Sequence, residues 1–129
     1  MNEKNLMLGN LVYPDHQDKT IVKVIGIGGG VVHFRYPDNS SGWHFSDHIQ
    51  PIPIEKDVWQ KNGFEERGPI LVLADDFYDI LVHELTDSIW TVTYHNCEMS
   101  LPDQRMHIGY VHELQNFLSM CSVEKEIVL

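Results

Sequence analysis

Residues 20–36 are Thr20-Ile21-Val22-Lys23-Val24-Ile25-Gly26-Ile27-Gly28-Gly29-Gly30-Val31-Val32-His33-Phe34-Arg35-Tyr36, and this stretch decides the fold of the first half of the chain. Its first six residues are β-branched apart from one lysine, and its last six are again rich in strand formers. The glycines between them supply the backbone freedom that a chain reversal needs. We therefore predict an antiparallel hairpin.

Turn-forming sequences flank this hairpin on both sides. Residues 14–19 close an apolar run over residues 8–13, and residues 37–42 (Pro-Asp-Asn-Ser-Ser-Gly) are the strongest turn cluster in the chain. Residues 43–52 then add one or two more short strands, at 43–45 and 48–52. Strands this short and this regularly interrupted predict a small SH3-like β-barrel over residues 1–54.

The prolines at 51 and 53 mark the boundary of that barrel, because neither can donate a backbone hydrogen bond to a sheet. Beyond them, residues 55–62 have acids in a first turn and a lysine in a last turn, which complements a helix dipole. Gly63 stands where a left-handed helix cap belongs, with Phe64 placed to fold back onto the helix. These residues predict a short capped helix.

Residues 55–129 form the second predicted domain, an antiparallel sheet with one or two short helices, so that the whole chain is α+β. The expected strands are residues 70–73, 77–85, 89–94 and 106–109, with a loop at 97–105 and a closing strand at 123–129. The clearest pairing is a hairpin over residues 82–94, because the polar turn Thr86-Asp87-Ser88 separates two β-rich runs.

Residues 110–120 carry a helical apolar stripe and contain the most catalytic-looking pattern in the chain. His112-Glu113 invites comparison with His-Glu-x-x-His, in which two histidines one helical turn apart bind zinc. The second histidine is replaced by Asn116, a poor zinc ligand, and a similar Val-His-Glu-Leu at 82–85 lies on a predicted strand. We interpret residues 112–116 as a structural helix whose Gln115 and Asn116 face solvent or cap a neighbouring strand.

The charge balance argues against two classes of partner. The 129 residues include 9 Lys and Arg against 19 Asp and Glu, a formal net charge of −10. Such a surface repels nucleic acid and anionic membranes at long range, and leaves a basic protein or a metal cation as possible partners. We therefore expect a protein partner, no nucleic acid and no membrane.

The sequence also predicts a cytoplasmic protein. Its start carries an acid, and the apolar run that follows is broken at Gly9-Asn10, which is unlike a signal peptide. No window approaches the roughly 20 apolar residues of a membrane span. Cys97 and Cys121 are expected to be reduced and partly buried.

Eight histidines make metal binding the first chemistry to consider. The densest group is His44, Asp47 and His48, with His33 on a neighbouring strand, and two histidines with one carboxylate can hold zinc or iron when they converge. Histidines scattered over a β-rich chain are more often hydrogen-bonding residues. We therefore predict no bound metal and no cofactor, and keep these three residues as weak candidates.

Two further patterns resemble catalytic or cofactor motifs. The glycines of Gly26–Gly30 come close to a dinucleotide fingerprint, but Val31 stands where the third glycine belongs and a strand follows in place of a helix. Cys97 with His95 nearby, or Cys121, are the only candidate nucleophiles. A reactive thiol needs electropositive surroundings, which an acidic chain disfavours, so we predict no catalytic residue.

Four stretches together resemble a family of uncharacterised small proteins from gut Bacteroidetes and their phages or other mobile elements. They are Leu8-Gly9-Asn10-Leu11-Val12, Ile49-Gln50-Pro51-Ile52-Pro53-Ile54, Asn62-Gly63-Phe64 and Tyr110-Val111-His112-Glu113-Leu114-Gln115-Asn116. The resemblance spans most of the chain and implies a mobile-element context and no particular activity. It also implies that Asn116 is a normal residue of this helix.

No stretch places a nucleophile, a base and a stabilising group together, so the function expected first is that of a non-enzymatic accessory or protein-interaction protein. Tyr36 and Trp43, on either side of the turn at 37–42, are the expected binding face. One alternative is a metal-dependent hydrolase that uses His44, Asp47 and His48. Another is an acidic mimic of nucleic acid that occupies a basic enzyme.

Overall fold

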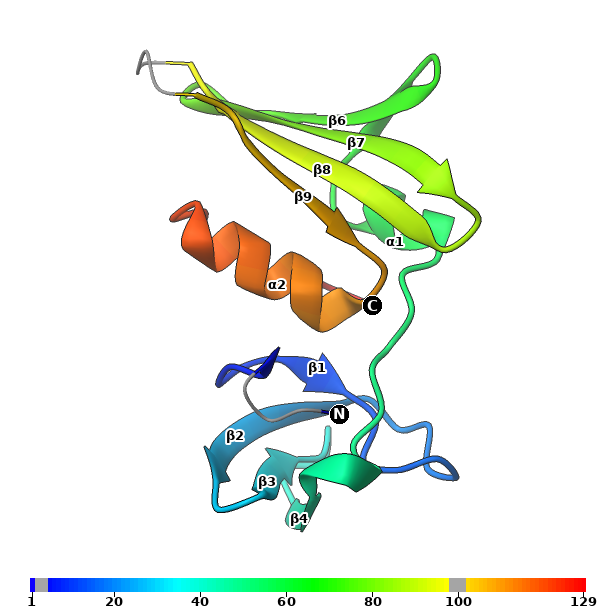
Figure 1. The fold of residues 1–129 in the computed structure, drawn as a ribbon, viewed down its shortest axis with the longest axis vertical. Helices are drawn as coiled ribbons and strands as arrows, with labels where there is room; N and C mark the ends of the chain where they lie inside the picture. The colour runs from blue at the N-terminus through cyan, green and yellow to red at the C-terminus, as the bar shows by residue number, and fades with distance from the viewer. Residues whose placement is uncertain (2–4, 98–101) are drawn as a thin grey trace. The chain divides into compact units, whose positions relative to one another are not determined.

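The computed structural model describes residues 1, 5–97 and 102–129, which form two antiparallel sheets and two α-helices (Figure 1). The fold class is therefore α+β. The chain divides into two compact units: unit 1 holds Met1–Pro53 and Tyr110–Asn116, and unit 2 holds Ile54–Gly109 and Phe117–Leu129. The four-stranded sheet belongs to unit 1 and the five-stranded sheet to unit 2.

Unit 1 is built around the predicted hairpin. Its elements are β1 (Leu11–Val12), β2 (Val22–Gly28), β3 (Val31–Arg35), β4 (Ser41–Phe45) and the 3-10 helix η2 (Ser46–His48), with sheet order β1-β2-β3-β4. The β2–β3 reversal is tighter than expected: only Gly29 and Gly30 form the turn, with φ of 61° and 77°. An irregularity in the pairing between Val24 and Gly26 bends β2 within the glycine-containing part.

The strand predicted at residues 48–52 is wrong. His48 ends η2, and only Gln50 forms an isolated antiparallel bridge, with Tyr13. The two residues exchange backbone hydrogen bonds of 2.9 and 3.0 Å. The pairing stops there because Pro51 has no N–H to extend it. The core of this unit comprises Leu6, Val12, Val22, Val24, Val32, Phe34 and Ile49.

The short strand β1 obtains further hydrogen bonds from a side chain. The apolar run at 8–13 contributes only two strand residues, because Gly9 turns the chain with a φ of 89°. The Gln115 amide then bonds the backbone on either side of Asn10: its oxygen accepts from the Leu11 amide at 2.8 Å, and its nitrogen donates to the Gly9 carbonyl at 3.2 Å. Of the two roles predicted for Gln115, facing solvent or capping a neighbouring strand, the structure shows the second.

Asn116 extends this contact by one more residue. Its side-chain oxygen accepts from the Asn10 amide nitrogen at 2.9 Å, and its own nitrogen donates to the Asn5 carbonyl at 3.0 Å. Asn10 is 3% exposed and uses its remaining side-chain oxygen to accept from the Met7 amide at 2.8 Å. A buried polar side chain is stable only when such partners are present.

Unit 2 is an antiparallel meander. Its elements are α1 (Lys56–Lys61), β5 (Glu65–Arg67), β6 (Ile70–Ala74), β7 (Tyr78–Thr86), β8 (Ile89–Asn96) and β9 (Gln104–Ile108), and α2 (Val111–Met120) runs from unit 1 into it. The sheet order is β5-β6-β7-β8-β9, and Thr86 pairs with Ile89 across the predicted hairpin turn. Part of the predicted loop at 97–105, residues 98–101, lies outside the described residues, and Gln104 already belongs to β9.

The helix α1 ends as its sequence predicts. Gly63 has a φ of 88°, and the Phe64 amide donates to the Trp59 carbonyl at 3.1 Å, as in a Schellman cap. The Phe64 ring folds back onto Trp59, with 5.1 Å between ring centroids. Trp59 also contacts Trp90 of β8 at 5.7 Å, which joins the helix to the sheet of this unit.

The closing strand predicted at residues 123–129 is wrong, because its backbone pairs with a side chain. Asn62 is 4% exposed; its amide nitrogen donates to the Val128 carbonyl and its oxygen accepts from the Val128 amide, both at 2.8 Å. Val123 and Ile127 are buried nonetheless. The tail is therefore held by two apolar side chains and by one amide.

One strand has no signal in the sequence. β5 is Glu65-Glu66-Arg67, fully exposed and polar, and it forms an edge of the five-stranded sheet. The β propensity and alternation by which strands are recognised are absent from it.

In the described part of the chain, no helix is long and apolar enough to cross a membrane.

We predict that Gln115→Met destabilises the protein by about 1–3 kcal/mol, because it leaves the Leu11 amide and the Gly9 carbonyl without their side-chain partners. Chemical denaturation measures the change in unfolding free energy. Gln60→Met is the matched control, since Gln60 is an exposed helical glutamine. Equal stability of the two variants would show that the Gln115 contacts contribute nothing.

Candidate functional site

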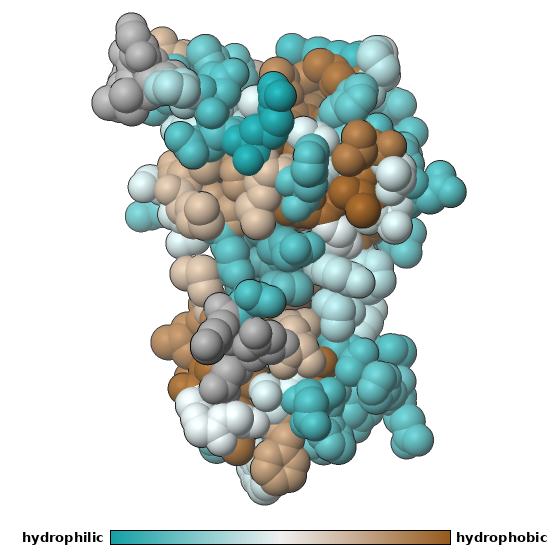
Figure 2. Space-filling model, in the orientation of Figure 1, coloured by the Kyte–Doolittle hydropathy of each residue, from teal (hydrophilic) through white to brown (hydrophobic). Residues whose placement is uncertain are grey.

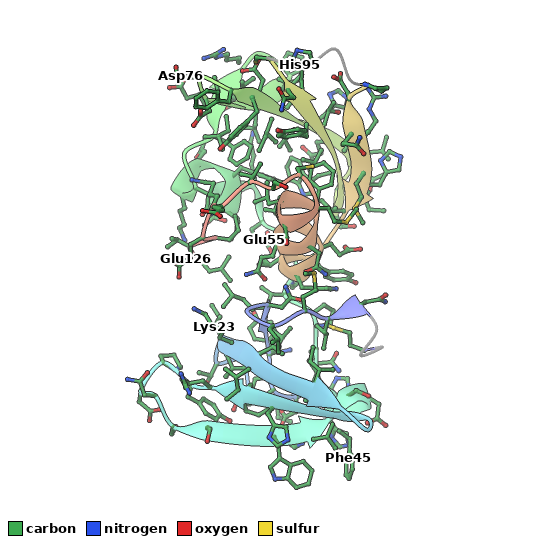
Figure 3. The ribbon with its side chains drawn as sticks, turned by 90° about the vertical axis from the view of Figure 1, so that its left-hand side faces the viewer. Lys23, Phe45, Glu55, Asp76, His95 and Glu126 are labelled. Atoms are coloured by element: carbon green, nitrogen blue, oxygen red, sulfur yellow. The ribbon has the colours of Figure 1, made fainter. Side chains whose placement is uncertain are left out.

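The most distinctive surface of unit 1 lies on its outer strand, β4. Trp43 and Phe45 alternate along this strand with Gly42 and His44, and their side chains are 55% and 54% exposed. The two rings meet edge to face, with 5.6 Å between centroids. The Phe45 side chain points away from the sheet into solvent (Figure 3), and apolar residues interrupt the hydrophilic surface of this unit (Figure 2). We call Trp43 and Phe45 the β4 aromatic pair.

The aromatic pair continues into a series of ring contacts. The ring centroids of Phe45 and His48 are 6.2 Å apart. His48 stacks on His44 with 5.3 Å between ring centroids and only 8° between the ring planes. His44 in turn stacks on the buried Phe34 at 6.3 Å. The exposed rings are therefore supported through the two histidines by the core of unit 1.

The strand register defines which residues share the exposed face. His33 of β3 is directly opposite Trp43, and Val31 is opposite Phe45. Because cross-strand partners point to the same side of a sheet, His33 and Val31 form the rest of this face beside the aromatic pair. His44 is opposite the buried Val32 and therefore belongs to the other face.

Tyr36 does not join Trp43 on this face. It packs edge-on against Phe34 at 5.5 Å, and its hydroxyl donates to Asp18 at 3.2 Å. Desolvation and this carboxylate raise the pKa of Tyr36. Of the predicted pair, Trp43 is exposed and Tyr36 is half-buried, and the neighbour that Trp43 has in the structure is Phe45.

The candidate metal ligands do not converge. His44 Nε2 lies 3.6 Å from Asp15, and His48 Nε2 lies 4.0 Å from Asp47. Hydrogen bonds from the Asp18 and Gln17 amides hold the pKa of Asp15 below its usual range, so the carboxylate is stabilised by its own loop. Among residues 1, 5–97 and 102–129, no three His, Cys, Asp or Glu side chains form a group that could hold a metal ion.

The candidate nucleophiles lie in unit 2. The Cys97 thiol donates to Asp79 at 3.7 Å, and His95 Nδ1 is 2.7 Å from Asp103. His95 and Asp76 lie at the same end of the five-stranded sheet (Figure 3). A carboxylate beside the thiol is the opposite of the electropositive setting that activates cysteine. Burial raises the pKa of the other thiol, Cys121.

The His112-Glu113 pattern has a structural explanation. Glu113 accepts a hydrogen bond from the Tyr110 amide at 3.1 Å, which caps the start of α2. His112 is 5% exposed and stacks on the Tyr110 ring at 6.0 Å, while no described residue bonds its Nδ1 atom. Burial lowers the pKa of His112, so the neutral ring is favoured.

Comparisons of the chain with protein-family models, curated proteins and solved structures found no match. The arrangement on β4 offers flat, exposed aromatic surface with little charge. Such a surface can bury apolar area against a second molecule.

We predict that His112 makes the protein less stable in mild acid. Because its pKa is lowered by folding from the usual 6.5, its contribution is complete above pH 6.5 and is lost as pH falls toward the folded value. The loss is at most about 1.4 kcal/mol per pH unit. His112→Gln should flatten the pH dependence of the unfolding free energy below pH 6.5. The control substitution is His83→Gln, at an exposed strand position.

We also predict that the purified protein has no structural metal. Elemental analysis should find well under one zinc or iron per chain, and EDTA should leave the melting temperature unchanged, because the rings of His44 and His48 stack on each other and each lies beside a different carboxylate, Asp15 or Asp47. A stoichiometric metal that is lost in His44→Ala would contradict this prediction.

Proposed function

We propose that this chain is a non-enzymatic accessory protein of a phage or mobile element that acts in the host cytoplasm by binding a protein partner through the β4 aromatic pair. The observation that carries the proposal is the exposure of two large rings in contact with each other, Trp43 at 55% and Phe45 at 54%. Exposed apolar clusters on small domains are typical of interaction sites.

The energetics favour these residues over other exposed apolar side chains. Tryptophan dominates binding energy at protein interfaces because a single rigid ring system buries a large area. Other exposed hydrophobic residues, such as Phe77 and Leu85 in unit 2, make no aromatic ring contact within the described part of the chain, whereas the aromatic pair is preassembled on a strand. Little conformational entropy is then lost when the pair is covered.

Within the same proposal, unit 1 is an SH3-like small barrel. Its support is the sequence of four short antiparallel strands followed by η2, and the bridge between Tyr13 and Gln50 that brings the segment after η2 beside the end of β1. Small barrels of this kind use exposed aromatic residues and connecting loops to bind other molecules, which is compatible with the role proposed for β4.

One alternative has an observation in its favour. Unit 2 contains 13 of the 19 acidic residues and 5 of the 9 basic residues, so it carries −8 of the formal −10 charge. A basic enzyme bound by a nucleic-acid mimic would therefore bind unit 2. Binding that weakens steeply with added salt would favour this mode, and salt-insensitive binding would favour the aromatic pair. The metal-dependent hydrolase has no comparable support.

We predict that the double variant Trp43→Ala/Phe45→Ala loses at least about tenfold in affinity for its partner, as expected when hot-spot rings are removed. Affinity-tagged chain would capture the partner from host cells, and titration would measure the affinity. Phe77→Ala/Leu85→Ala is the matched control, since these side chains are 57% and 53% exposed. Equal capture by both double variants would overturn the proposed function.

A further inference from the structure

The edges of the two sheets differ in how they are protected. An unpaired strand edge invites pairing with another chain, and proteins usually block it with charge, proline or short length. The edge strand β5 consists of three charged residues, Glu65–Arg67, and the edge strand β9 carries Arg105. The edge strand β4, Ser41-Gly42-Trp43-His44-Phe45, contains no Asp, Glu, Lys or Arg.

The hydrogen bonds that flank β4 show which of its backbone groups point outward. The Tyr36 amide donates to the Ser40 carbonyl, and the Ser46 amide donates to the Gly30 carbonyl, both at 2.8 Å. Bonded and non-bonded pairs alternate along an antiparallel ladder, so Gly42 and His44 also bond inward to β3. The N–H and C=O groups of the intervening residues, Ser41, Trp43 and Phe45, therefore face away from β3.

These three residues present a complete row of donors and acceptors. No backbone or side-chain hydrogen bond to their outward groups is present among the described residues. Their side chains are all exposed. β4 is therefore ready to accept one more antiparallel strand over its full length.

We propose that this strand is β4 of a second copy of the chain, paired antiparallel about a two-fold axis at Trp43. In this register Trp43 is opposite Trp43 of the second copy, and Ser41 is opposite Phe45. All three pairs join residues whose backbone groups point outward, as an antiparallel ladder requires. Each pair exchanges two hydrogen bonds, and the two four-stranded sheets become one.

The residue sizes of β4 suit this register. Phe45 meets the small Ser41 of the other copy on the exposed face, and His44 meets Gly42 on the inner face. Gly42 is required to be small for a second reason, because a Cβ there would lie 3.0 Å from the Phe34 ring. The sequence of large and small residues is thus complementary to itself when it is reversed about Trp43.

Charge also favours a second copy. Self-pairing places no formal charges opposite each other along β4, and unit 1 carries only −2 of the −10 charge of the chain. The pairing uses the backbone edge, and it brings two aromatic pairs onto one continuous face. Such a dimer would enlarge the surface used in the proposed function. Dimerisation is measured on the purified chain alone, so either proposal can be wrong without the other.

A charge exchange at the two-fold axis tests the register. We expect the wild-type chain to dimerise with a dissociation constant on the order of 1–100 μM, as for a small interface. Trp43→Lys and Trp43→Glu should each weaken dimerisation at least about tenfold, because like charges then lie directly opposite each other. An equimolar mixture of the two should dimerise at least about tenfold more tightly than either alone. Analytical ultracentrifugation measures all three.

The matched control is His33→Lys, which places the same charge on the same face but one strand in from the edge. It should leave dimerisation within about twofold of wild type, since His33 is not opposite its own copy. Loss of the dimer in this control as well would show that the added charge acts through the exposed face of the sheet and not through the edge of β4.

A cross-link gives a readout that does not depend on a charged variant. Trp43→Cys, in a chain with Cys97→Ser and Cys121→Ser, should form an intermolecular disulfide under mild oxidation, because paired Cα atoms in this geometry are about 5.5 Å apart. Val31→Cys, on the adjacent strand, should not. A wild-type chain that is monomeric at about 200 μM, or a charge mixture that does not associate, would overturn the proposal whether or not a protein partner is captured.

Discussion

The amide of Gln115 acts as the missing neighbour of the strand β1, and unit 1 depends on this contact. β1 has only two residues, and a strand so short cannot hold its place through pairing with β2 alone. Gln115 bonds the Leu11 amide and the Gly9 carbonyl as an adjacent strand would, at a position 104 residues further along the chain. A sheet edge that would otherwise expose unsatisfied groups is thereby fixed.

The same solution recurs in unit 2, where Asn62 bonds both backbone groups of Val128. In each unit a side-chain amide makes the backbone hydrogen bonds that a residue of a neighbouring strand would otherwise make. An amide is suited to this because it presents one acceptor and one donor side by side, as a peptide group does. The remaining edges are managed by charge on β5 and β9, which leaves β4 as the edge whose composition permits pairing. Edge protection therefore explains why interaction is expected at β4 and not elsewhere.

The elements that could be predicted from the sequence are mostly those specified by a few adjacent residues. The β2–β3 hairpin, the capped helix α1 and the turn between β7 and β8 each follow from a few adjacent residues, and each is confirmed. The wrong predictions concern segments whose partners are distant. Residues 123–129 alternate like a strand, but their backbone partner is the Asn62 side chain, which no local pattern reveals. β5 is polar because it is an exposed edge, so periodicity has nothing to detect.

The candidate site shows the same division between local pattern and register. The alternation in Ser41–Phe45 places Trp43 and Phe45 on one face, and this could have been deduced from the strand period of two. Tyr36 was expected beside Trp43 because both flank one turn, yet the strand ends at Arg35 and Tyr36 turns back towards Asp18. Closeness in sequence across a turn does not fix the face, whereas register does. The histidine count gives no geometry either: His44 and His48 are adjacent and stacked, but each faces a different carboxylate. Metal ligands must converge on a point, whereas these rings lie in a row that begins at the buried Phe34 and ends at the exposed Phe45.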